Sequence, residues 1–401
     1  MKGAYIFLFL LVLGCTQGPK EQNPEVKQEL AAMISPAVGN SSLPYLISGD
    51  DGELYLSWVE QLGDTALLKY AKWEGNNWSS TEDIASGTDW FVNWADYPML
   101  AASKDGEMVA HYLAKSSAGT YSYDVNITRK VENSWTASMV PHKDGTPTEH
   151  GFATMIPAKS NGFQLAWLDG RNTSGGHGEH QGAMSIRAAM MDDQGALSNE
   201  VELDNRVCDC CQTGGAMTTN GPVVIYRDRS EMEVRDMSIV RLVDGEWTAP
   251  QTIYADNWKI EGCPVNGPRA DAVGNTLAVA WFAAPNKQPQ VKLIFSEDGG
   301  ASFGNPVTID NQMPLGRVDV VMIDEEKAMV SWLGREGENS VIKARIVSKT
   351  GRAEPAMTIA KSSESRGSGF PQMAYHDGEM WFAWTDMSEE GNSVKVAKMG
   401  I

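Results

Sequence analysis

The stretch FQLAWLDGR, residues 163–171, decides the fold because variants of it recur along the whole chain. Related stretches are LYLSWVE (54–60), LAVAWFAA (277–284), AMVSWLGRE (328–336) and MWFAWTDMS (380–388). Successive units place their central aromatic residue 51 to 59 positions apart, at Trp58, Tyr112, Trp167, Tyr226, Trp281, Trp332 and Trp384. Short apolar strands repeated at about 40–55 residues are typical of a β-propeller. We therefore predict an all-β chain folded as a β-propeller of seven blades, with six blades as the alternative.

Each unit divides into four strands, here called a to d from the inside of the ring outward. Tight Asp-Gly and Asn-Gly turns separate strands a and b in most units, as expected for short hairpins. The last unit lacks a fourth strand, and we expect residues 29–36 to fill that position and close the ring. The innermost strands are expected to begin near Pro44, Pro98, Phe152, Cys211, Pro264, Val318 and Pro371.

The N-terminus has the anatomy of an export signal. Lys2 supplies a positive charge, and residues 6–13 form an apolar core too short to span a bilayer as a helix. The segment VLGC (12–15), at the end of this apolar core, resembles a bacterial lipobox. This resemblance implies a lipidated Cys15 as the mature N-terminus. An ordinary signal peptide with an incidental cysteine is the alternative. We expect residues 1–14 to be a lipoprotein signal peptide, 15–29 a flexible linker and 30–401 a single propeller domain.

The charge balance limits the partners. The chain carries 33 Lys and Arg residues against 52 Asp and Glu residues, for a formal net charge of −19. Such an acidic chain argues against nucleic acid and anionic membrane surfaces as partners. We expect contact with a membrane only through the lipid anchor. The predicted location is therefore the bacterial cell envelope, outside the cytoplasm and facing either the periplasm or the surface.

One turn carries a family signature. Residues 296–303, SEDGGASF, match the Asp-box S-x-D-x-G-x-x-[WF], so the chain resembles the sialidase (neuraminidase) propellers with BNR repeats. In such a turn the Asp298 side chain would cap backbone amides, and glycine would permit positive φ. In that family the box lies on the turn between strands c and d, away from the active site. The chain also resembles a group of exported bacterial propellers that share its Cys-Asp-Cys-Cys-Gln-Thr stretch.

The unusual polar residues are expected on one face of the ring. In a propeller the loops from b to c and from d to a share a face, and in blades 3 to 5 these loops hold nearly all of the unusual polar residues. Residues 206–213, 227–236 and 259–269 belong to this set, and Arg317 and Asp319 open blade 6. Polar residues from distant positions that converge on one face indicate a functional site on a scaffold.

Four cysteines lie in these loops: Cys208, Cys210, Cys211 and Cys263. In an exported protein they are expected to form disulfides, with three pairings open. A bridge between Cys211 and Cys263 would fit two adjacent innermost strands, leaving Cys208 to pair with Cys210; a bond between the neighbours Cys210 and Cys211 is another option. The alternative is a thiolate site for copper(I) or zinc, completed by His150, His177 or His180. No other cofactor is predicted.

The arginines suggest an acidic ligand, because a guanidinium group binds carboxylates in two-point fashion. Resemblance to sialidases implies an arginine cluster for an acidic sugar, an Asp acid/base and a Tyr nucleophile polarised by a Glu. The Arg-Ile-Pro motif of that family is absent, so no catalytic residue is transferred from it. Arginine–aspartate pairs that join loops are the alternative. The candidates for carboxylate binding are Arg171, Arg227, Arg229, Arg269 and Arg317, and those for acid/base catalysis are Asp169, Asp228 and Glu231.

Three hypotheses follow for the function. The first is an exported, lipid-anchored propeller that hydrolyses or binds acidic glycans, as an exo-sialidase-like glycoside hydrolase if it is an enzyme. The second is a metal or redox module built on the cysteines. The third is a scaffold without catalytic activity on which partner proteins dock, because the fold alone does not determine function.

Overall fold

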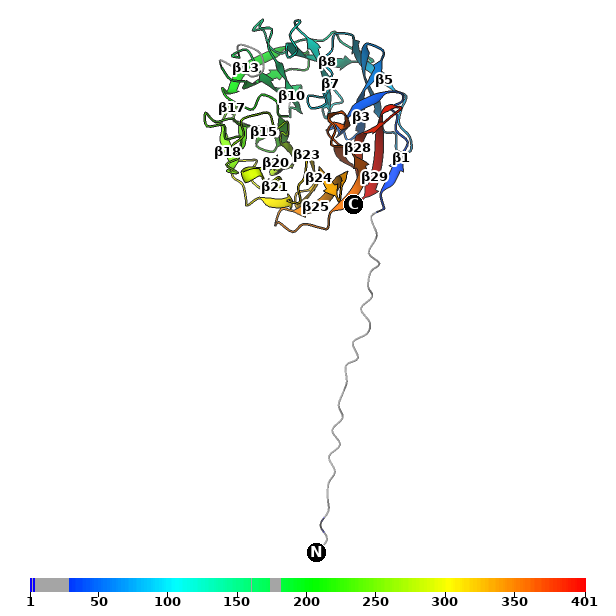
Figure 1. The fold of residues 1–401 in the computed structure, drawn as a ribbon, viewed down its shortest axis with the longest axis vertical. Helices are drawn as coiled ribbons and strands as arrows, with labels where there is room; N and C mark the ends of the chain where they lie inside the picture. Colours follow the sequence, from blue (N-terminus) through cyan, green and yellow to red (C-terminus); the bar gives the residue numbers. More distant parts are fainter. Residues whose placement is uncertain (2, 4–28, 160, 174–181) are drawn as a thin grey trace.

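The computed structural model describes residues 1, 3, 29–159, 161–173 and 182–401. In these residues the strands form seven antiparallel sheets around a common axis (Figure 1). The predicted seven-bladed β-propeller is therefore confirmed. Nearly all of the predicted signal peptide and linker lies outside the described residues, as do Cys15, His177 and His180. Among the described residues, no helix is both long and apolar enough to cross a membrane.

The blades follow one another along the chain. Blade 1 contains β2 (Ser41–Ser48), β3 (Leu54–Leu62), β4 (Thr65–Lys72) and β5 (Glu82–Gly87). Blade 2 contains β6 (Met99–Ala102), β7 (Met108–Lys115), β8 (Tyr123–Val131) and β9 (Ser134–Trp135). Blade 3 contains β10 (His150–Pro157), β11 (Phe163–Asp169), β12 (Ser185–Met191) and β13 (Leu197–Asp204). Blade 4 contains β14 (Gly214–Thr218), β15 (Gly221–Arg227), β16 (Met237–Val243), β17 (Glu246–Trp247) and β18 (Gln251–Tyr254).

The remaining blades complete the ring. Blade 5 contains β19 (Arg269–Val273), β20 (Thr276–Ala283), β21 (Gln290–Ser296) and β22 (Val307–Asp310). Blade 6 contains β23 (Gly316–Asp324), β24 (Lys327–Glu336), β25 (Asn339–Ser348) and β26 (Met357–Ser362). Blade 7 contains β27 (Gln372–His376), β28 (Glu379–Ser388), β29 (Gly391–Gly400) and β1 (Ala31–Met33).

The ring is closed by the N-terminal strand. Strand β1 pairs antiparallel with β29, with Ala31 opposite Lys398 and Met33 opposite Val396 (Figure 1). This is the segment that the sequence predicted for the missing outer strand of blade 7. Pairing the first and last strands of the domain protects an edge that would otherwise offer unpaired backbone groups.

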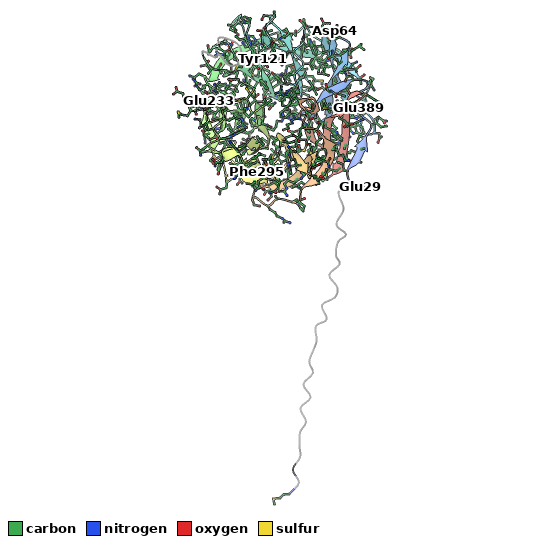
Figure 2. The ribbon with its side chains drawn as sticks, viewed as in Figure 1. Glu29, Asp64, Tyr121, Glu233, Phe295 and Glu389 are labelled. Atoms are coloured by element: carbon green, nitrogen blue, oxygen red, sulfur yellow. The ribbon has the colours of Figure 1, made fainter. Side chains whose placement is uncertain are left out.

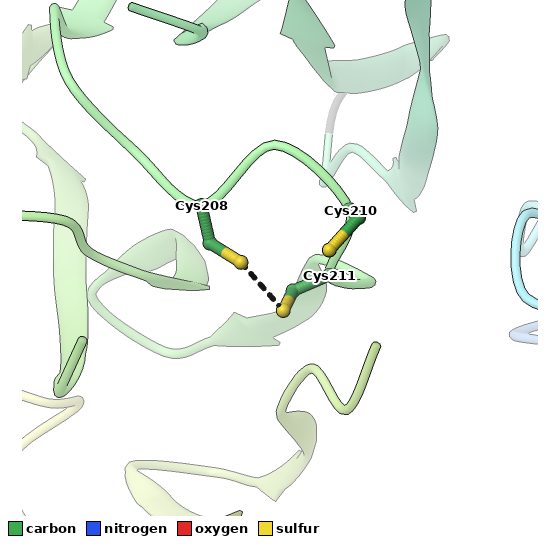
Figure 3. Close-up of side chains that lie close together, drawn as sticks. All are labelled: Cys208, Cys210 and Cys211. Atoms are coloured by element: carbon green, nitrogen blue, oxygen red, sulfur yellow. Dashed lines mark hydrogen bonds between the residues drawn. The ribbon is translucent and has the colours of Figure 1, made fainter. Parts of the chain in front are cut away.

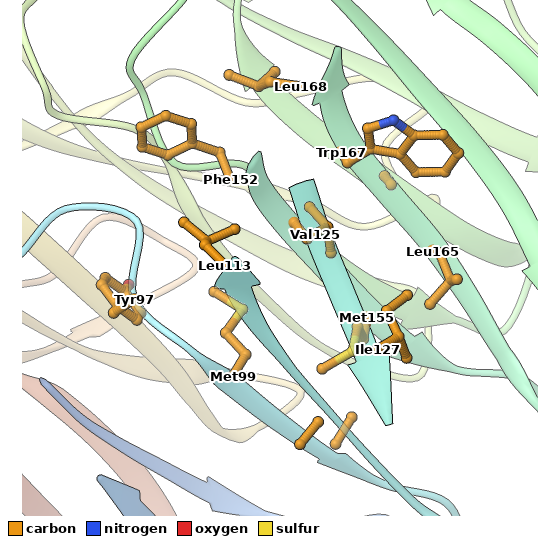
Figure 4. Close-up of a cluster of buried hydrophobic side chains, with 14 of the residues drawn as sticks. Tyr97, Met99, Leu113, Val125, Ile127, Phe152, Met155, Leu165, Trp167 and Leu168 are labelled. Carbon is orange, nitrogen blue, oxygen red and sulfur yellow. The ribbon is translucent and has the colours of Figure 1, made fainter. Parts of the chain in front are cut away.

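Apolar side chains between neighbouring blades form the core. Between blades 2 and 3, Val125 and Ile127 of β8 lie near Leu165 and Trp167 of β11 (Figure 4). The repeated aromatic residues occupy such positions: Trp58, Trp167, Tyr226, Trp281 and Trp332 are all at most 1% exposed. Tyr112 and Trp384 are only partly buried, and in blade 7 the fully buried ring belongs to Trp381.

Buried carboxylates bind adjacent blades together near the axis. Asp96 accepts a hydrogen bond from the Phe152 amide (2.8 Å), and Asp319 accepts one from the Met373 amide (2.7 Å). Burial raises the pKa of Asp96 to about 7, although the bond from Phe152 opposes the shift. Each of these carboxylates therefore links the inner backbone of one blade to the next.

The cysteines do not begin innermost strands, contrary to the prediction. Strand β14 begins at Gly214, beyond Cys211, and β19 begins at Arg269, beyond Cys263. The two loops that hold these cysteines cross above the strands, where the Gly267 amide donates to the Gln212 side chain (2.8 Å). A Cβ atom at Gly267 would collide with the Gln212 carbonyl oxygen, so this crossing requires glycine.

Candidate functional site

The two faces of the ring differ in their connections. We call the face that carries the long connections the loop face, made of residues 88–98, 116–122, 136–149, 205–213, 228–236 and 255–268 together with the ends of the adjoining strands. Figure 2 shows two of these loops by Tyr121 and Glu233, on different sides of the ring. The opposite end, which we call the turn face, carries the a–b and c–d turns. Every candidate residue of the sequence that is described lies on the loop face or near the ring axis.

Two histidines and three aspartates meet on the loop face of blades 2 and 3. We call this set the His–Asp cluster: Asp124, His142, Asp144, His150 and Asp169. Asp124 lies on β8, His150 begins β10 and Asp169 ends β11, whereas the other two lie on the 136–149 loop. Three separate chain segments thus bring five titratable groups together.

The two imidazole rings stack with their centroids 3.7 Å apart and their planes at 16°. His142 Nδ1 lies 2.8 Å from Asp144 Oδ2, and His150 Nδ1 lies 3.1 Å from Asp124 Oδ1. His150 Nε2 lies 3.3 Å from Asp144 Oδ2 and 3.7 Å from Asp169 Oδ1. His142 is 7% exposed and His150 is fully buried, so both rings are held in fixed orientations by carboxylates.

The surroundings set the charges in the cluster. Burial and the neighbouring His150 lower the pKa of His142, which keeps this imidazole neutral near pH 7. Burial opposes the ionisation of Asp144, but hydrogen bonds from Thr146 and charge interactions with His150 and His142 hold the pKa of its carboxyl below the ordinary value. A neutral imidazole beside an ionised carboxylate is the arrangement that a general base requires.

Asp169 and Arg171, both predicted from the sequence, form a two-point ion pair at the edge of this cluster. Arg171 Nε lies 2.8 Å from Asp169 Oδ1 and Nη2 lies 2.7 Å from Oδ2, while Nη2 also reaches Glu200 (2.9 Å). Although burial disfavours the charge, this pairing lowers the pKa of Asp169. Asp169 is therefore placed to orient Arg171 and His150 rather than to donate a proton.

The other two predicted acid/base residues lie in blade 4. Burial raises the pKa of Asp228, which accepts a hydrogen bond from the Arg229 amide (2.6 Å). Glu231 is exposed on the 228–236 loop. The three predicted carboxylates thus belong to two different blades, and Asp169 alone of them joins the His–Asp cluster.

Two predicted arginines bind main-chain oxygens. Arg227 is 2% exposed and donates to the carbonyls of Asn266 (2.7 Å) and Phe282 (2.6 Å). Arg317 donates to the Gly369 carbonyl (3.1 Å) and the Ser368 hydroxyl (2.6 Å). These guanidinium groups hold loops together.

The remaining two arginines pair with acidic side chains at different places. Arg229 contacts Glu233 (2.9 Å) and Asp209 (3.1 Å) on the loop face of blade 4. Arg269 contacts Asp319 (3.0 Å) near the axis. The axial cavity, of about 240 Å³, is lined by the side chains of Tyr45, Ser48, Arg269, Asp271, Asp319 and Tyr375 among others. It offers two carboxylates against one guanidinium, a balance that does not favour an anion.

The cysteine cluster, made of Cys208, Cys210, Cys211 and Cys263, lies in two loops of blades 3 to 5. The sulfurs of Cys208, Cys210 and Cys211 all lie within 4.8 Å of one another (Figure 3). Cys208 Sγ and Cys211 Sγ are 2.7 Å apart. All four are free thiols in this structure.

The structure places the cysteines differently from the prediction. Cys263 lies on the 255–268 loop, ahead of β19, and no disulfide joins it to Cys211. His150, offered as a metal ligand beside the thiols, belongs to the His–Asp cluster. Three converging thiols are nevertheless a donor set that suits copper(I) or zinc.

Sequence reasoning missed Asp124, His142 and Asp144. The available signal is the stretch His142-Lys143-Asp144-Gly145-Thr146 in the loop between blades 2 and 3, whereas the sequence prediction places the functional face on blades 3 to 6. A tyrosine–glutamate pair was missed as well. Tyr123 donates to Glu149, but its side chain is fully buried in blade 2, and burial raises the pKa of Glu149 to about 8.

The sequence matches no family model and no curated protein sequence. Solved structures with the same fold include a Dyadobacter fermentans protein of unknown function (14% identity, TM-score 0.54), with 90% of this chain and 95% of that one covered. Polysaccharide lyase Uly1 is 10% identical, with a TM-score of 0.51 and coverage of 94% and 90%. The NanB sialidase of Streptococcus pneumoniae is 9% identical, with a TM-score of 0.44 and coverage of 92% and 70%. This likeness shows the fold alone.

Proposed function

We propose that this protein acts on an acidic polysaccharide at the loop face of blades 2 to 4, with the His–Asp cluster as its acid–base centre. The observation that carries the proposal is the pair of stacked, buried imidazoles held by three carboxylates next to Arg171. Buried titratable groups with perturbed pKa values are concentrated at functional sites. The propeller fold, shared with a polysaccharide lyase and a sialidase, supports a carbohydrate as the substrate.

The charges in the cluster favour elimination over hydrolysis. Hydrolysis by a carboxylate pair requires one protonated carboxyl as the general acid. Asp144 and Asp169 have lowered pKa values and remain ionised at neutral pH. The neutral His142 can instead remove the proton on the carbon next to a uronic acid carboxylate. The electron pair of the broken C–H bond forms the new C=C bond, the bond to the leaving sugar oxygen breaks, and that oxygen takes up a proton from water. Of the predicted arginines, Arg171 lies at the cluster and would hold the substrate carboxylate.

A panel of uronic acid-containing and sialylated polysaccharides tests this proposal. Elimination would produce an unsaturated uronic acid, seen as ultraviolet absorbance, together with new reducing ends. Hydrolysis would give reducing ends without that absorbance. A chain that binds a polysaccharide without either product is a lectin-like binder, and no binding across the panel would contradict the proposal and favour a protein-docking scaffold.

Variants assign the activity to the cluster. His142→Ala should reduce turnover by at least 100-fold, because general-base catalysis contributes about 10²–10⁴-fold. The matched control is His376→Gln, since His376 also lies beside an aspartate (3.5 Å from Asp377) but on the turn face. Equal losses in both variants would argue against the cluster as the catalytic centre.

We also propose that Cys15 is lipidated and anchors the mature chain at the bacterial cell envelope. The VLGC stretch after the apolar core supports this. Cys15→Ser should release the protein from the membrane fraction, and mass spectrometry of the mature N-terminus should lose the acyl groups. Retention of the serine variant in the membrane fraction would contradict the anchor.

A further inference from the structure

Three thiols converge at one turn of the 205–213 loop. The chain turns at Asp209 and Cys210, so that the sulfurs of Cys208 and Cys211 face each other. The three cysteines are at most 8% exposed, and their sulfurs all lie within 4.8 Å of one another (Figure 3). In the part of the chain that the structure describes, this group has three sulfurs and no fourth cysteine, histidine or carboxylate within that distance of them all.

A cation lies beside these sulfurs. A buried cysteine alone commonly behaves as a small apolar side chain. Here, however, Arg235 Nη1 lies 3.4 Å from Cys208 Sγ, and Arg235 is 2% exposed. Its Nη2 group pairs with Glu233 (2.8 Å), whereas its Nε group has no hydrogen-bond partner among the described residues. The cluster is therefore set against a buried and incompletely bonded cation rather than against apolar groups alone.

A second buried guanidinium group lies in the same region. The Cys208 amide donates to the Arg227 carbonyl (2.9 Å), and Arg227 Nη1 donates to the Arg235 carbonyl (2.7 Å). The other bonds of Arg227 go to the carbonyls of Asn266 and Phe282, and within the described ranges no carboxylate forms an ion pair with it. Because a buried charge without a partner is costly, an anionic group beside these arginines would be stabilised.

The donor set selects a soft cation. Thiolate sulfur favours copper(I) and zinc over harder ions. A structural zinc ion takes four ligands in tetrahedral geometry, and the three sulfurs have no fourth partner among the described residues. Copper(I) accepts a trigonal set of sulfurs, and its complex with three thiolates carries a net negative charge that matches the buried cations. Ligand number and charge therefore favour copper(I).

The contact between Cys208 and Cys211 raises the choice between a metal ion and a disulfide. Their sulfurs are 2.7 Å apart. A disulfide requires about 2.05 Å, whereas two sulfurs bound to one metal ion at about 2.3 Å each lie roughly 4 Å apart in a trigonal site. Either outcome moves the sulfurs, but a disulfide is neutral. It would leave Arg235 beside an uncharged sulfur and would not use Cys210, whereas a copper(I) complex uses all three thiols and the cation.

We propose that Cys208, Cys210 and Cys211 bind one copper(I) ion through their sulfurs, and that Arg235 stabilises the negative charge of the complex. Each thiol releases its proton to solvent when its sulfur binds, the copper ion keeps its oxidation state, and no electron is transferred. Cys263 lies outside the ligand set. The site shares no residue with the His–Asp cluster, so it is independent of the proposed polysaccharide activity.

The experiment uses the full-length protein, reduced, stripped of metal and kept free of oxygen. Copper(I) is added in competition with a chromogenic copper(I) chelator. One copper ion should bind per chain, with the ultraviolet charge-transfer absorbance of copper–thiolate bonds and three sulfur neighbours in X-ray absorption. Absence of copper(I) binding would overturn the proposal. Stoichiometric zinc with four ligands would overturn it as well, and so would a Cys208–Cys211 disulfide that persists in the reduced chain.

Two cysteine variants assign the ligands. Cys210→Ser should weaken copper(I) binding at least about 100-fold, because loss of an outer partner alone costs about 10–100-fold. Cys263→Ser is the matched control, since Cys263 is a cysteine of the 255–268 loop outside the three-sulfur group, and it should leave the affinity nearly unchanged. Equal losses in the two variants would overturn the ligand set.

The role of the cation is tested by Arg235→Gln. This change removes the charge beside Cys208 and should weaken copper(I) binding about tenfold, the size of effect expected for a group outside the ligand set. Unchanged affinity would contradict the role of Arg235. If Arg235→Gln fails to fold, Cys210→Ser still decides the site, because Cys210 is the most exposed of the three cysteines.

Discussion

The two faces of this propeller are made from the same strands but depend on different parts of the sequence. On the turn face, Asp298 accepts hydrogen bonds from the Ser302 amide (2.8 Å) and hydroxyl (2.6 Å), all within one turn. On the loop face, Arg227 binds carbonyls of residues 39 and 55 positions away. The side-chain interactions of Asp298 are therefore local and exposed, whereas those of Arg227 are long-range and buried. Loss of Arg227 should cost more stability than loss of Asp298.

Removal of a buried cation from the loop face should have the largest effect on the free energy of unfolding. Arg227→Met should lower the free energy of unfolding by about 3–5 kcal/mol, because it leaves buried carbonyl groups of two loops without donors. Denaturant unfolding measures this change. A loss below about 1 kcal/mol would show that these contacts on the loop face stabilise no more than an exposed turn does.

The pH dependence of stability provides the second test. The pKa of Asp96 is raised to about 7 by burial, so its native carboxyl holds a proton that the unfolded chain has lost above pH 4. The protonated Asp96 carboxyl contributes fully to the stability of the fold below the pKa that it has in the unfolded chain. This contribution is lost as the pH rises through about 7. Asp96→Asn should therefore stabilise the protein by up to about 4 kcal/mol at pH 8 and have little effect at pH 4.

The matched control for this test is Asp298→Asn, whose carboxyl lies on the turn face and has a lowered pKa because hydrogen bonds from Ser302 and Ser296 outweigh burial. Asp298→Asn should lower the free energy of unfolding at pH 8 and lower it less at low pH. Its pH dependence therefore has the opposite sign to that of Asp96→Asn. Thermal unfolding across pH 4 to 8 distinguishes the two. Parallel pH profiles for the two variants would break the comparison between the faces.

The difference between the faces also explains what the sequence predicted. Turns and strand periodicity depend on neighbouring residues, so seven blades could be predicted from spacing, and the last unit's missing fourth strand pointed to the N-terminal segment as its partner. The His–Asp cluster could not, since Asp124 and His150 are 26 residues apart and meet only when blades 2 and 3 pack. The arginines show the same limit. The sequence shows that they are charged, but Arg317 donates its hydrogen bonds to carbonyl groups 47 to 52 residues away along the chain.

Removal of the turn-face cap is the third test and a smaller one. Asp298→Ala deletes the acceptor for the Ser302 amide, which can turn to solvent because Ser302 is exposed. We expect a loss of about 1 kcal/mol, similar to that of a capping residue. Denaturant unfolding of this variant and of Arg227→Met, measured side by side, gives the ratio of the two losses in the free energy of unfolding. A loss as large as that of Arg227→Met would mean that this turn supports packing between blades.

An exposed ion pair on the turn face should show the smallest effect. Lys327 Nζ lies 3.9 Å from Asp324, and the two side chains are 39% and 51% exposed. Asp324 also accepts the Glu326 and Lys327 amides, and these bonds survive in Lys327→Ala. The variant should lose less than about 0.5 kcal/mol, and added salt should remove even that difference. Thermal unfolding at low and high salt measures it. A larger loss that salt does not change would show that Lys327 stabilises the protein through more than its local ion pair with Asp324.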